Sequence, residues 1–585
     1  MKYKLISKKL NPEMDLGKQI LSNRGIVNPE KYMSLDNSCL NSYNDLDNIN
    51  KAIKCFQKHF KNRDKIAILQ DVDFDGYASS ALMYMYIKEL DRDYPLYTIQ
   101  HTFPKVHGLN QMNKGDFQLQ EGTKLFIVPD AGSEDFEIHK QLKSEGVDVI
   151  ILDHHECDKG YSPHAIVVNN QLSSKFDNKN LCGTGVVMKF LQALDEEEWN
   201  FYADGYKDLN AFANIADVMD MREYETKFLA DEGLTAIKNP FIKQLIKEQE
   251  YSLKGSKLNK IKVAFYIVPL LNAMIRFGTF EEKELVFQAL TCQREDEDFI
   301  FVPKTGPRKG VEVHETIYER AARLCKNVKA TQDSSRDKAI KEFEEIIEQN
   351  PNKDTDKILI VPYNSNIDST LSGLSAMILA SKYKRPVLVG KVDSFGKVSG
   401  SARNYGRFIE QDLRSTLTDS GYFEYCRGHE GAFGFSLERK NIDKVIKWFN
   451  EKYQNAEIEN FFGVDDIYPV SDIPDNLFDV VDSLSGIWGT NVDEPLFAFE
   501  DIDVETKDIF IMGSKTKMSN YKFYSNGIQF IKFSAKTDDK LLRYCEDWTV
   551  SSVKLQVVGR VGYDSYSDQN IKTVYIEDYN IVFAD

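Results

Sequence analysis

The first third of the chain alternates short apolar runs with segments of helical spacing. Four runs have the length of a strand that is buried on both faces, namely Lys65–Leu69, Lys124–Val128, Asp148–Leu152 and Ala165–Val168. Segments such as Ser79–Leu90 carry apolar residues at helical spacing between these runs. This alternation predicts a parallel sheet that is covered by helices on both of its faces.

The middle of the chain is mainly helical. Residues 210–329 have helical spacing, and a charged helix is predicted at Ser335–Asn350. The polar run Thr331–Arg336 separates these two parts, and we expect it to act as a hinge. Runs of strand length return at Lys357–Val361 and Pro386–Gly390, which predicts a second and smaller α/β unit.

The last part of the chain changes to short strands that are separated by turns. Ser525-Asn526-Gly527, between two of these strands, is a hairpin signal. A β-rich segment of this length fits a small barrel. We therefore predict an α/β protein of four parts: an N-terminal parallel-sheet domain with an extension (1–240), a helical connector (241–335), a smaller α/β domain (336–455) and an all-β barrel-like domain (456–585).

Composition and charge narrow the class of protein. The 585 residues are 42% hydrophobic and 28% charged, which is typical of a folded, soluble chain. The longest mostly apolar stretch, Val263–Ile275, is too short for a membrane span, and the first residues lack a signal-peptide pattern, so we expect a cytoplasmic protein. Eight cysteines without a Cys-x-x-Cys pair argue against a disulfide framework or a zinc site. The net charge of −17 argues against a nucleic-acid partner unless basic side chains line a local groove.

Acidic and imidazole side chains follow three of the predicted strands, at the point where each strand ends. They are Asp71, Asp73, Asp75, Asp130, Asp153, His154 and His155. Active sites of open parallel sheets form outside the carboxyl ends of the strands, so we expect these side chains to share one crevice. Asp217 is a further candidate, because it lies in an apolar helical segment where an unpaired charge would be costly.

So many carboxylates repel one another unless a cation neutralises them. Oxygen ligands with one or two imidazoles suit Mn²⁺ or Mg²⁺. Asp73 and Asp75 are close enough in sequence to bind one ion or to bridge two, and a pair of ions about 4 Å apart would activate water for attack on a phosphoester. The alternative is that each acid only caps a helix, which is frequent for a single residue but explains three strand ends poorly.

Four motifs along the chain carry a family resemblance. They are Asp71–Gly76, Asp130, Asp153-His154-His155 and Ala216-Asp217-Val218. In this order they resemble the DHH phosphoesterase superfamily and, within it, the RecJ-like single-strand-specific exonucleases of bacteria or phages. The Gly183-Thr184-Gly185 turn and the segment Pro269–Ala273, which Arg276 follows, also resemble the family.

The resemblance extends through the rest of the chain. Ser399–Arg403 and Gly428–Gly434 are similar to motifs of the DHH-associated substrate-binding domain. The second of these resembles a GGHxxAAG run, although Arg427 stands where the first glycine is usual and Phe433 where the second alanine is usual. Gly486–Phe497 resembles the segment that leads into the RecJ OB-fold, which implies an OB-fold-like single-strand-binding domain at the C-terminus.

The resemblance implies roles for individual residues. The metal ligands would be Asp73, Asp75, Asp130, His154 and Asp217. The other catalytic residues would be His155, beside the scissile phosphate, and Asp153 and Asp71, whose carboxylates would orient the ligands. The substrate-binding residues would be Arg276, Asn272, Ser401, Arg403, Gly428, His429 and Gly431. Read without the family, Arg276 is a solvated helix residue and Asn272 a buried structural amide.

By this resemblance, the chain would be a metal-dependent 5′-to-3′ exonuclease that hydrolyses single-stranded DNA to 5′-mononucleotides. Two ions, Mn²⁺ or Mg²⁺, would activate the attacking water. Further partners would be a single-strand-binding protein or a helicase in DNA repair or recombination, and we expect a monomer. The basic residues that line the DNA path would include Arg276, Arg403, Lys515, Lys517 and Lys522.

Two other functions stay open. DHH hydrolases of short oligoribonucleotides or cyclic dinucleotides share the chemistry, but they are usually shorter and lack a C-terminal OB-fold. A catalytically inactive DHH scaffold would bind single strands in a replication or repair assembly. Such scaffolds typically lose the acidic motifs, which this chain retains.

Overall fold

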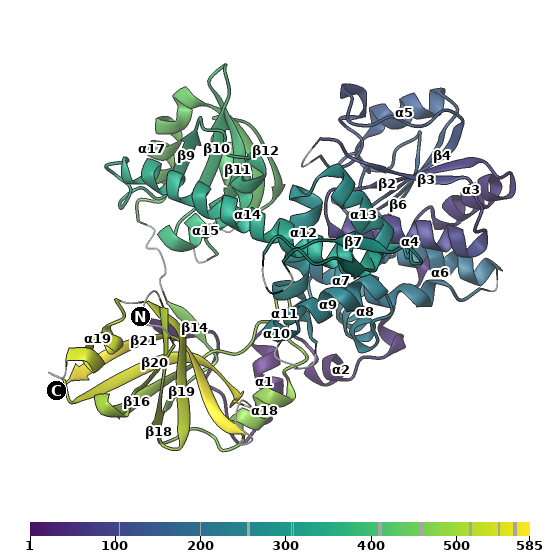
Figure 1. Ribbon diagram of the computed structural model, residues 1–585. Coiled ribbons are helices and arrows are strands. Elements are labelled where there is room, and N and C mark those ends of the chain that lie inside the picture. Colours follow the sequence, from purple (N-terminus) through teal and green to yellow (C-terminus); the bar gives the residue numbers. More distant parts are fainter. Residues whose placement is uncertain are drawn as a thin grey trace.

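The computed structural model describes most of the chain. The residues outside the description are 104–105, 199, 254–257, 306, 308, 407–411, 456–460, 514–517, 537, 548–549 and 565–569. Lys515 and Lys517, which we expected along a DNA path, therefore lie outside the described residues. Helices connect two α/β units and a β-rich unit, and both chain termini lie in the β-rich unit (Figure 1). None of the described helices is long and apolar enough to cross a membrane.

The N-terminal domain contains a five-stranded, all-parallel sheet in the order β3-β2-β4-β5-β6. Its strands are β2 (Lys65–Gln70), β3 (Leu96–Gln100), β4 (Thr123–Pro129), β5 (Asp148–Asp153) and β6 (Ile166–Asn169). Four of these strands confirm the predicted runs. Strand β3 was not predicted, because it lies at the sheet edge and its first three residues are only half-buried.

Helices cover both faces of this sheet, as the apolar runs predicted. They are α3 (Ile49–Lys61), α4 (Phe74–Leu90), α5 (Phe136–Ser144), α6 (Gly183–Glu198), α7 (Lys207–Ala216) and α8 (Tyr224–Thr235). Ile66 and Ile68 of β2 pack in the cluster that includes α4 and α6, whereas Ala67 and Leu69 pack in the cluster that includes α5. Alternate residues of one strand thus enter different cores, which explains its continuous apolar run.

A group of helices leads from this domain to the second α/β unit. Its elements are α9 (Pro240–Glu248), α10 (Glu250–Leu253), α11 (Lys260–Lys262), a π-helical turn (Val263–Ile267), α12 (Val268–Phe277), α13 (Phe280–Leu290), the hairpin β7 (Phe299–Phe301) and β8 (Val313–Glu315), and α14 (Ile317–Glu348). Helix α14 is continuous over 32 residues, so the predicted hinge at Thr331–Arg336 is wrong. Ion pairs of Asp333 with Lys329 and Arg336 stabilise the helix across this polar run.

The second α/β unit is a mixed sheet in the order β12-β13-β11-β10-β9. Its strands are β9 (Leu359–Tyr363), β10 (Val387–Val392), β11 (Lys397–Arg403), β12 (Phe423–His429) and β13 (Ala432–Glu438). Its helices are α15 (Ser372–Tyr383), α16 (Leu413–Asp419) and α17 (Ile442–Lys452). The unit has its own core, which α14 joins through Phe343 and Ile347, and so its position depends on that helix.

The C-terminal unit is a seven-stranded sheet in the order β15-β16-β20-β21-β19-β18-β17. Its strands are β15 (Asp466–Pro469), β16 (Phe497–Glu505), β17 (Phe510–Met512), β18 (Met518–Ser525), β19 (Ile528–Lys536), β20 (Ser552–Asp564) and β21 (Ile571–Ala584), and two helices, α18 (Leu477–Ser483) and α19 (Lys540–Asp547), accompany them. The predicted hairpin turn joins β18 to β19, with positive φ at Asn526 and Gly527. The seven strands confirm the predicted β-rich character of this unit. Among the described strands, no hydrogen-bonded ladder joins the edge strands β15 and β17, so the sheet is not closed into the predicted barrel.

The N-terminal extension packs on this C-terminal unit. Strand β1 (Tyr3–Leu5) pairs in parallel with β14 (Phe462–Val464). After α1 (Leu16–Ser22), Arg24 forms a buried ion pair with Asp465. Helix α2 (Pro29–Met33) follows and leads towards α3. The first residues of the chain are thus packed against the start of the C-terminal unit.

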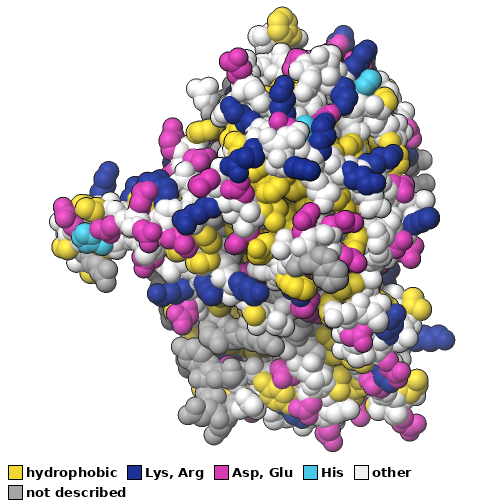
Figure 2. Space-filling view, turned by 90° about the vertical axis from the view of Figure 1, so that its right-hand side faces the viewer, with side chains coloured by type: hydrophobic (Ala, Val, Ile, Leu, Met, Phe, Trp, Pro, Cys, Tyr) yellow, Lys and Arg dark blue, Asp and Glu magenta, His cyan; other side chains and the backbone are white. Residues whose placement is uncertain are grey.

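Charges of both signs cover the face at the right of Figure 1, where the N-terminal domain lies. Figure 2 shows lysine and arginine side chains interspersed with acidic ones on this face, around a hollow where hydrophobic side chains are exposed. The net charge of −17 is therefore not gathered into one acidic patch on this side.

Candidate metal centre

The loop after β2 turns directly into helix α4 and carries the first acids. Asp73 is the N-cap of α4, and its Oδ1 accepts a hydrogen bond from the Gly76 N–H at 3.2 Å. Asp75 is buried in the first turn, and its carboxylate accepts from the N–H groups of Gly183 at 2.6 Å and Thr184 at 2.8 Å. The capping alternative thus holds for Asp73, whereas Asp75 is anchored at the N-terminus of α6, where the helix dipole favours negative charge.

Two glycines allow these acids to lie against the backbone. A Cβ at Gly76 would come within 2.6 Å of the Asp71 Cβ, and one at Gly183 within 2.5 Å of Asp130 Oδ1. Contacts this short do not occur in real structures, so a larger residue at either position would displace an acid. The lack of a side chain at Gly183, the first residue of the Gly183-Thr184-Gly185 turn, is therefore required for Asp130 to occupy its position in this site.

Four side chains from separate elements converge on one point. His154 Nε2 lies 3.2 Å from Asp130 Oδ1, 3.4 Å from Asp217 Oδ2 and 3.8 Å from Asp75 Oδ2. Asp130 follows β4 with a φ of 63°, a conformation that few non-glycine residues adopt and that often marks functional sites. Asp217 caps the C-terminus of α7. The structure thus brings together four of the five predicted metal ligands, and we call this group the metal cluster.

The metal cluster is electrostatically unfavourable on its own. Burial and the charges of Asp75 and Asp73 raise the pKa of both Asp130 and Asp217 well above the usual value. Burial and the charge of His155 lower the pKa of His154 to about 4. Neutral imidazole and crowded carboxylate are the forms that ligate a divalent cation, whose charge would remove the repulsion.

Unpartnered atoms test whether the residues fit such an ion. Asp130 Oδ1 and His154 Nε2 are buried and, in the described part of the chain, have no hydrogen bond. Buried polar atoms in folded proteins nearly always have a partner. Each of these atoms belongs to a group of ligand atoms lying within 4.8 Å of one another. Carboxylates with one imidazole match the donor set of Mn²⁺ or Mg²⁺, so the residues fit the metal.

Asp153 holds the two histidines in place from the end of β5. Its Oδ1 accepts from the N–H groups of His154 at 2.7 Å and His155 at 3.1 Å, and it lies 2.8 Å from His155 Nδ1. Its Oδ2 accepts from the Ser133 N–H at 3.1 Å. Burial would lower the pKa of His155, but the charge and hydrogen bond of Asp153 raise this pKa to about 10. Asp153 thus lies behind the metal cluster and bonds to both histidines, which is the position that an orienting carboxylate needs.

Asp71 has a similar place, with partners that we did not predict. It lies 3.1 Å from His101 Nε2 and 2.5 Å from His107 Nδ1. Burial alone would raise the pKa of Asp71, but the charge and hydrogen bonds of His107 and His101 hold it below its usual value. His101 directly follows β3, which was not predicted from the sequence, so His101 and His107 were not identified as site residues. A histidine directly after a predicted strand would have indicated them.

Helix α12 brings two predicted substrate residues to the same edge. Arg276 Nη2 lies 3.6 Å from Asp73 Oδ2, and its side chain is half exposed. Asn272 Oδ1 accepts from the Phe74 N–H at 3.3 Å, so this amide fixes the start of α4. The structural reading of Asn272 therefore has direct support, whereas Arg276 is available to an anion.

The second α/β unit faces the metal cluster with the other predicted residues. On β11, the Arg403 guanidinium packs on Gly373, where a Cβ would meet Nη2 at 2.8 Å and Ser401 Oγ at 3.5 Å. Burial and the charge of Arg276 lower the pKa of Arg403. Two arginines whose charges act on each other would both be relieved by a bound anion.

The β12–β13 turn carries the remaining predicted residues. Gly428 has a φ of 130°, and the Gly431 carbonyl accepts from the Asn404 N–H at 2.8 Å. Burial and then the charge of His155 lower the pKa of His429. The substrate-binding roles of Ser401, Gly428, His429 and Gly431 stay predictions.

Comparison with known proteins places this site in a family. The model of the DHH family, N-terminal domain, matches residues 65–219. A protein of Bacillus subtilis (strain 168), named as the SPbeta prophage-derived single-strand DNA-specific exonuclease YorK, is 36% identical over 588 residues, covering 99% of this chain and 98% of its own. The chain belongs to the RecJ-like exonucleases. RecJ of Haemophilus influenzae is 24% identical over 475 residues, covering 78% of each chain.

A solved structure supports the fold of this RecJ-like chain. RecJ of Thermus thermophilus, in complex with Mn²⁺, matches with a TM-score of 0.71 at 18% identity, covering 97% of this chain and 76% of that one. The same protein has also been solved with Mg²⁺. The RecJ-like architecture of the α/β units and the β-rich unit is therefore shown.

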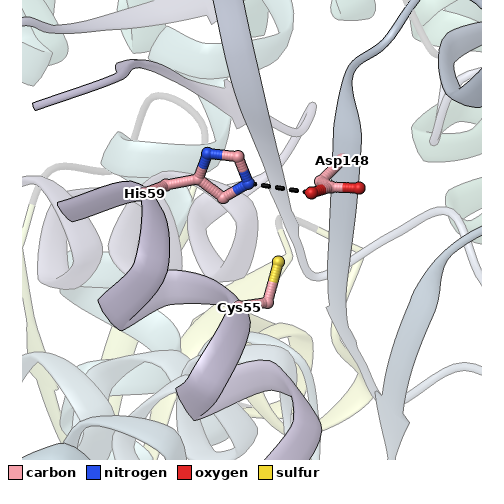
Figure 3. Close-up of side chains that lie close together, drawn as sticks. All are labelled: Cys55, His59 and Asp148. Carbon is pink, nitrogen blue, oxygen red and sulfur yellow. Dashed lines mark hydrogen bonds and ion pairs between the residues drawn. The ribbon is translucent and has the colours of Figure 1, made fainter. Parts of the chain in front are cut away.

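A second group of potential ligands lies at the opposite end of the sheet. Cys55, His59 and Asp148 lie together, and His59 points at Asp148 (Figure 3). Asp148 is already bonded to Lys58 at 3.1 Å, Lys143 at 2.6 Å and His59 at 2.9 Å. Burial raises the pKa of Cys55 to about 11, which keeps its thiol protonated. In the RecJ-like chain this group is a salt-bridge network, and its cations disfavour a metal.

Proposed function

We propose that the chain hydrolyses single-stranded DNA from the 5′ end and releases 5′-mononucleotides. The observation that carries the proposal is the metal cluster, in which Asp130 Oδ1 and His154 Nε2 are buried without a hydrogen bond among the described residues. The substrate and its single-stranded form come from the names of the relatives.

The metal cluster supports hydrolysis by two ions. We propose that the ligands are Asp73, Asp75, Asp130, His154 and Asp217. Mn²⁺ or Mg²⁺ bound there would supply Lewis-acid chemistry, which activates water and offsets charge on the phosphate. Asp153 and Asp71 orient the histidines, and His155, held through Nδ1, presents its half-exposed ring to the substrate.

The other parts of the chain would bind the strand. Arg276 on α12 and Arg403 on β11, where the charge of Arg276 lowers the pKa of Arg403, are suited to bind the terminal phosphate. We propose that Ser401, Gly428, His429 and Gly431 of the second α/β unit contact the strand next to the metal cluster. We propose that the β-rich unit acts as an OB-like single-strand-binding domain, and that the four parts divide at residues 240, 335 and 455.

The decisive experiment compares DNA strands labelled at either end. Purified protein with Mn²⁺ should release labelled mononucleotide at once from a 5′-labelled strand, and should shorten a 3′-labelled strand stepwise. Duplex DNA should resist hydrolysis. Faster hydrolysis of oligoribonucleotides or cyclic dinucleotides than of long strands would replace the proposal with the first alternative. Intact DNA after hours, with single-strand binding retained, would establish the scaffold alternative.

A further inference from the structure

A row of hydrogen bonds connects a half-exposed histidine beside the metal cluster to the protein interior. His107 Nδ1 lies 2.5 Å from Asp71 Oδ2, and Asp71 Oδ1 lies 3.1 Å from His101 Nε2. His101 Nδ1 in turn lies 2.5 Å from Asp116 Oδ2. The side chains of Asp71, His101 and Asp116 are at most 1% exposed, whereas that of His107 is 51% exposed. The row begins in the core and ends at an accessible ring.

The two residues after His107 are anchored by backbone hydrogen bonds. The Gly108 N–H donates to Asp71 Oδ1 at 3.2 Å, and the Leu109 N–H donates to Asp135 Oδ2 at 2.6 Å. Gly108 has a φ of 70°, and a Cβ there would come within 2.5 Å of Asp135 Oδ2. An exposed ring with this support is pre-organised, as ligand-binding groups are.

The position of the ring relates it to the metal cluster. The His107 and His155 ring centroids are 6.1 Å apart, and the His155 and His154 centroids are 4.5 Å apart. Three imidazoles therefore extend from the cluster towards solvent. No group in the described part of the chain bonds to His107 Nε2. A carboxylate on Nδ1 favours the imidazolium form, whose Nε2–H is a donor suited to a phosphate oxygen.

We propose that His107 is a substrate-binding residue that holds, through Nε2, a phosphate oxygen of the strand beside the metal cluster. Asp71, His101 and Asp116 are positioning residues that fix the ring. The proposal rests on the proposed nuclease function. His101, in contrast, is buried with both ring nitrogens bonded, which suits a structural role.

The test compares His107→Phe with His107→Gln, whose amide can still donate, and with His314→Phe as a control on the distant, exposed β7–β8 hairpin. Three quantities are measured: kcat and KM on single-stranded DNA, the rise in melting temperature with Mn²⁺, and the affinity for a hydrolysis-resistant phosphorothioate strand. Loss of a hydrogen bond to a charged group should lower kcat/KM of His107→Phe by about 10- to 100-fold. The response to Mn²⁺ should be retained, and His107→Gln should recover part of the loss.

Two results would overturn the proposal. His107→Phe could match the wild type within about twofold, or it could lose its response to Mn²⁺ together with activity, which would assign His107 to the metal site through Asp71. A wild-type protein that leaves DNA intact would refute the proposed function instead. In that case weaker binding of the phosphorothioate strand by His107→Phe, but not by His314→Phe, would still support a phosphate contact.

Discussion

The carboxylates of the metal cluster repel one another, and a bound cation would offset this repulsion. Asp130 and Asp217 have a raised pKa because burial and neighbouring carboxylates disfavour their charged forms. An acid whose pKa is raised in the folded state destabilises that state at neutral pH, because the same carboxyl ionises more readily in the unfolded chain. These acids are retained in spite of this cost, which is expected for ligands of a cation.

The variant Asp130→Asn separates the repulsion between the carboxylates from their binding of a cation. Removing one buried carboxylate relieves repulsion, so the melting temperature of the metal-free protein should stay the same or rise. Stabilisation by Mn²⁺, about 2.7 kcal/mol at a hundredfold excess over Kd for the wild type, should be largely lost together with hydrolysis. Calorimetry with and without Mn²⁺ measures both. The exposed control Asp158→Asn should behave as wild type, and an unchanged Mn²⁺ response in Asp130→Asn would contradict the ligand assignment.

Gly183→Ala tests how tightly the backbone confines Asp130. The added Cβ would lie 2.5 Å from Asp130 Oδ1, so the acid or the start of α6 must move. Overpacking of this kind typically costs about 1–3 kcal/mol of unfolding free energy, and we expect at least tenfold lower activity. Urea denaturation and steady-state kinetics measure these effects. Gly205→Ala, where no atom lies within 4 Å of the added Cβ, is the matched control and should change neither.

The helices of the connector decide how the two α/β units meet. Helix α12 places Arg276 beside Asp73, and α14 enters the core of the second unit through Phe343 and Ile347. The polar run Thr331–Arg336 is suited to a loop by composition, yet it is helical because ion pairs and flanking packed turns support it. A rigid helix, in place of a hinge, then sets the distance between Arg276 and Arg403.

Ser334→Pro tests whether α14 must be continuous. Proline inside a helix removes a hydrogen bond and costs about 3 kcal/mol, so the unfolding free energy should fall by this order and kcat/KM on long strands should fall as well. The Mn²⁺-induced rise in melting temperature should persist, because the metal cluster lies in the other unit. Ser334→Ala is the control. If proline were tolerated within about 0.5 kcal/mol, the segment would be a hinge after all.

The whole molecule must bind an anionic polymer with a net charge of −17. Acidic and basic side chains are interspersed on the face shown in Figure 2, so the overall charge does not forbid a local basic path. The positive charge of Arg276, on α12, contributes to the lowered pKa of Arg403, on β11. Phosphate contacts should therefore be few and localised between the α/β units.

The salt dependence of single-strand binding should report this confinement. Each phosphate contact contributes about −0.7 to the slope of log K against log salt concentration for single strands. Arg276→Gln and Arg403→Gln should each make the slope less negative by about 0.7, as fluorescence anisotropy can measure. Lys447→Gln, an exposed lysine of α17, should leave it unchanged. Equal slopes in all three variants would place the DNA elsewhere.

The order of the acids along the chain was sufficient to predict that they lie at one edge of the sheet. Asp73, Asp75, Asp130 and His154 follow strands whose apolar runs are plain in the sequence, and the carboxyl ends of parallel strands share one edge by geometry. The Ser525-Asn526-Gly527 turn was predictable for an equally local reason, since these residues tolerate the positive φ that the hairpin needs. The strands and the turn are each marked by a local pattern, and the regular geometry of a parallel sheet then brings the strand ends to one edge.

Tertiary packing decided the rest. Edge strand β3 is only half-buried over most of its length, so its sequence shows little of the pattern that identified the other strands, and His101 and His107 became visible only with it. The pairing of β1 with β14 joins segments from the two ends of the chain, which no local pattern can indicate. Helix α14 likewise packs against α9 and α12 of the connector and against the core of the second α/β unit. Such features gain their free energy from distant segments, and only the folded chain brings those segments together.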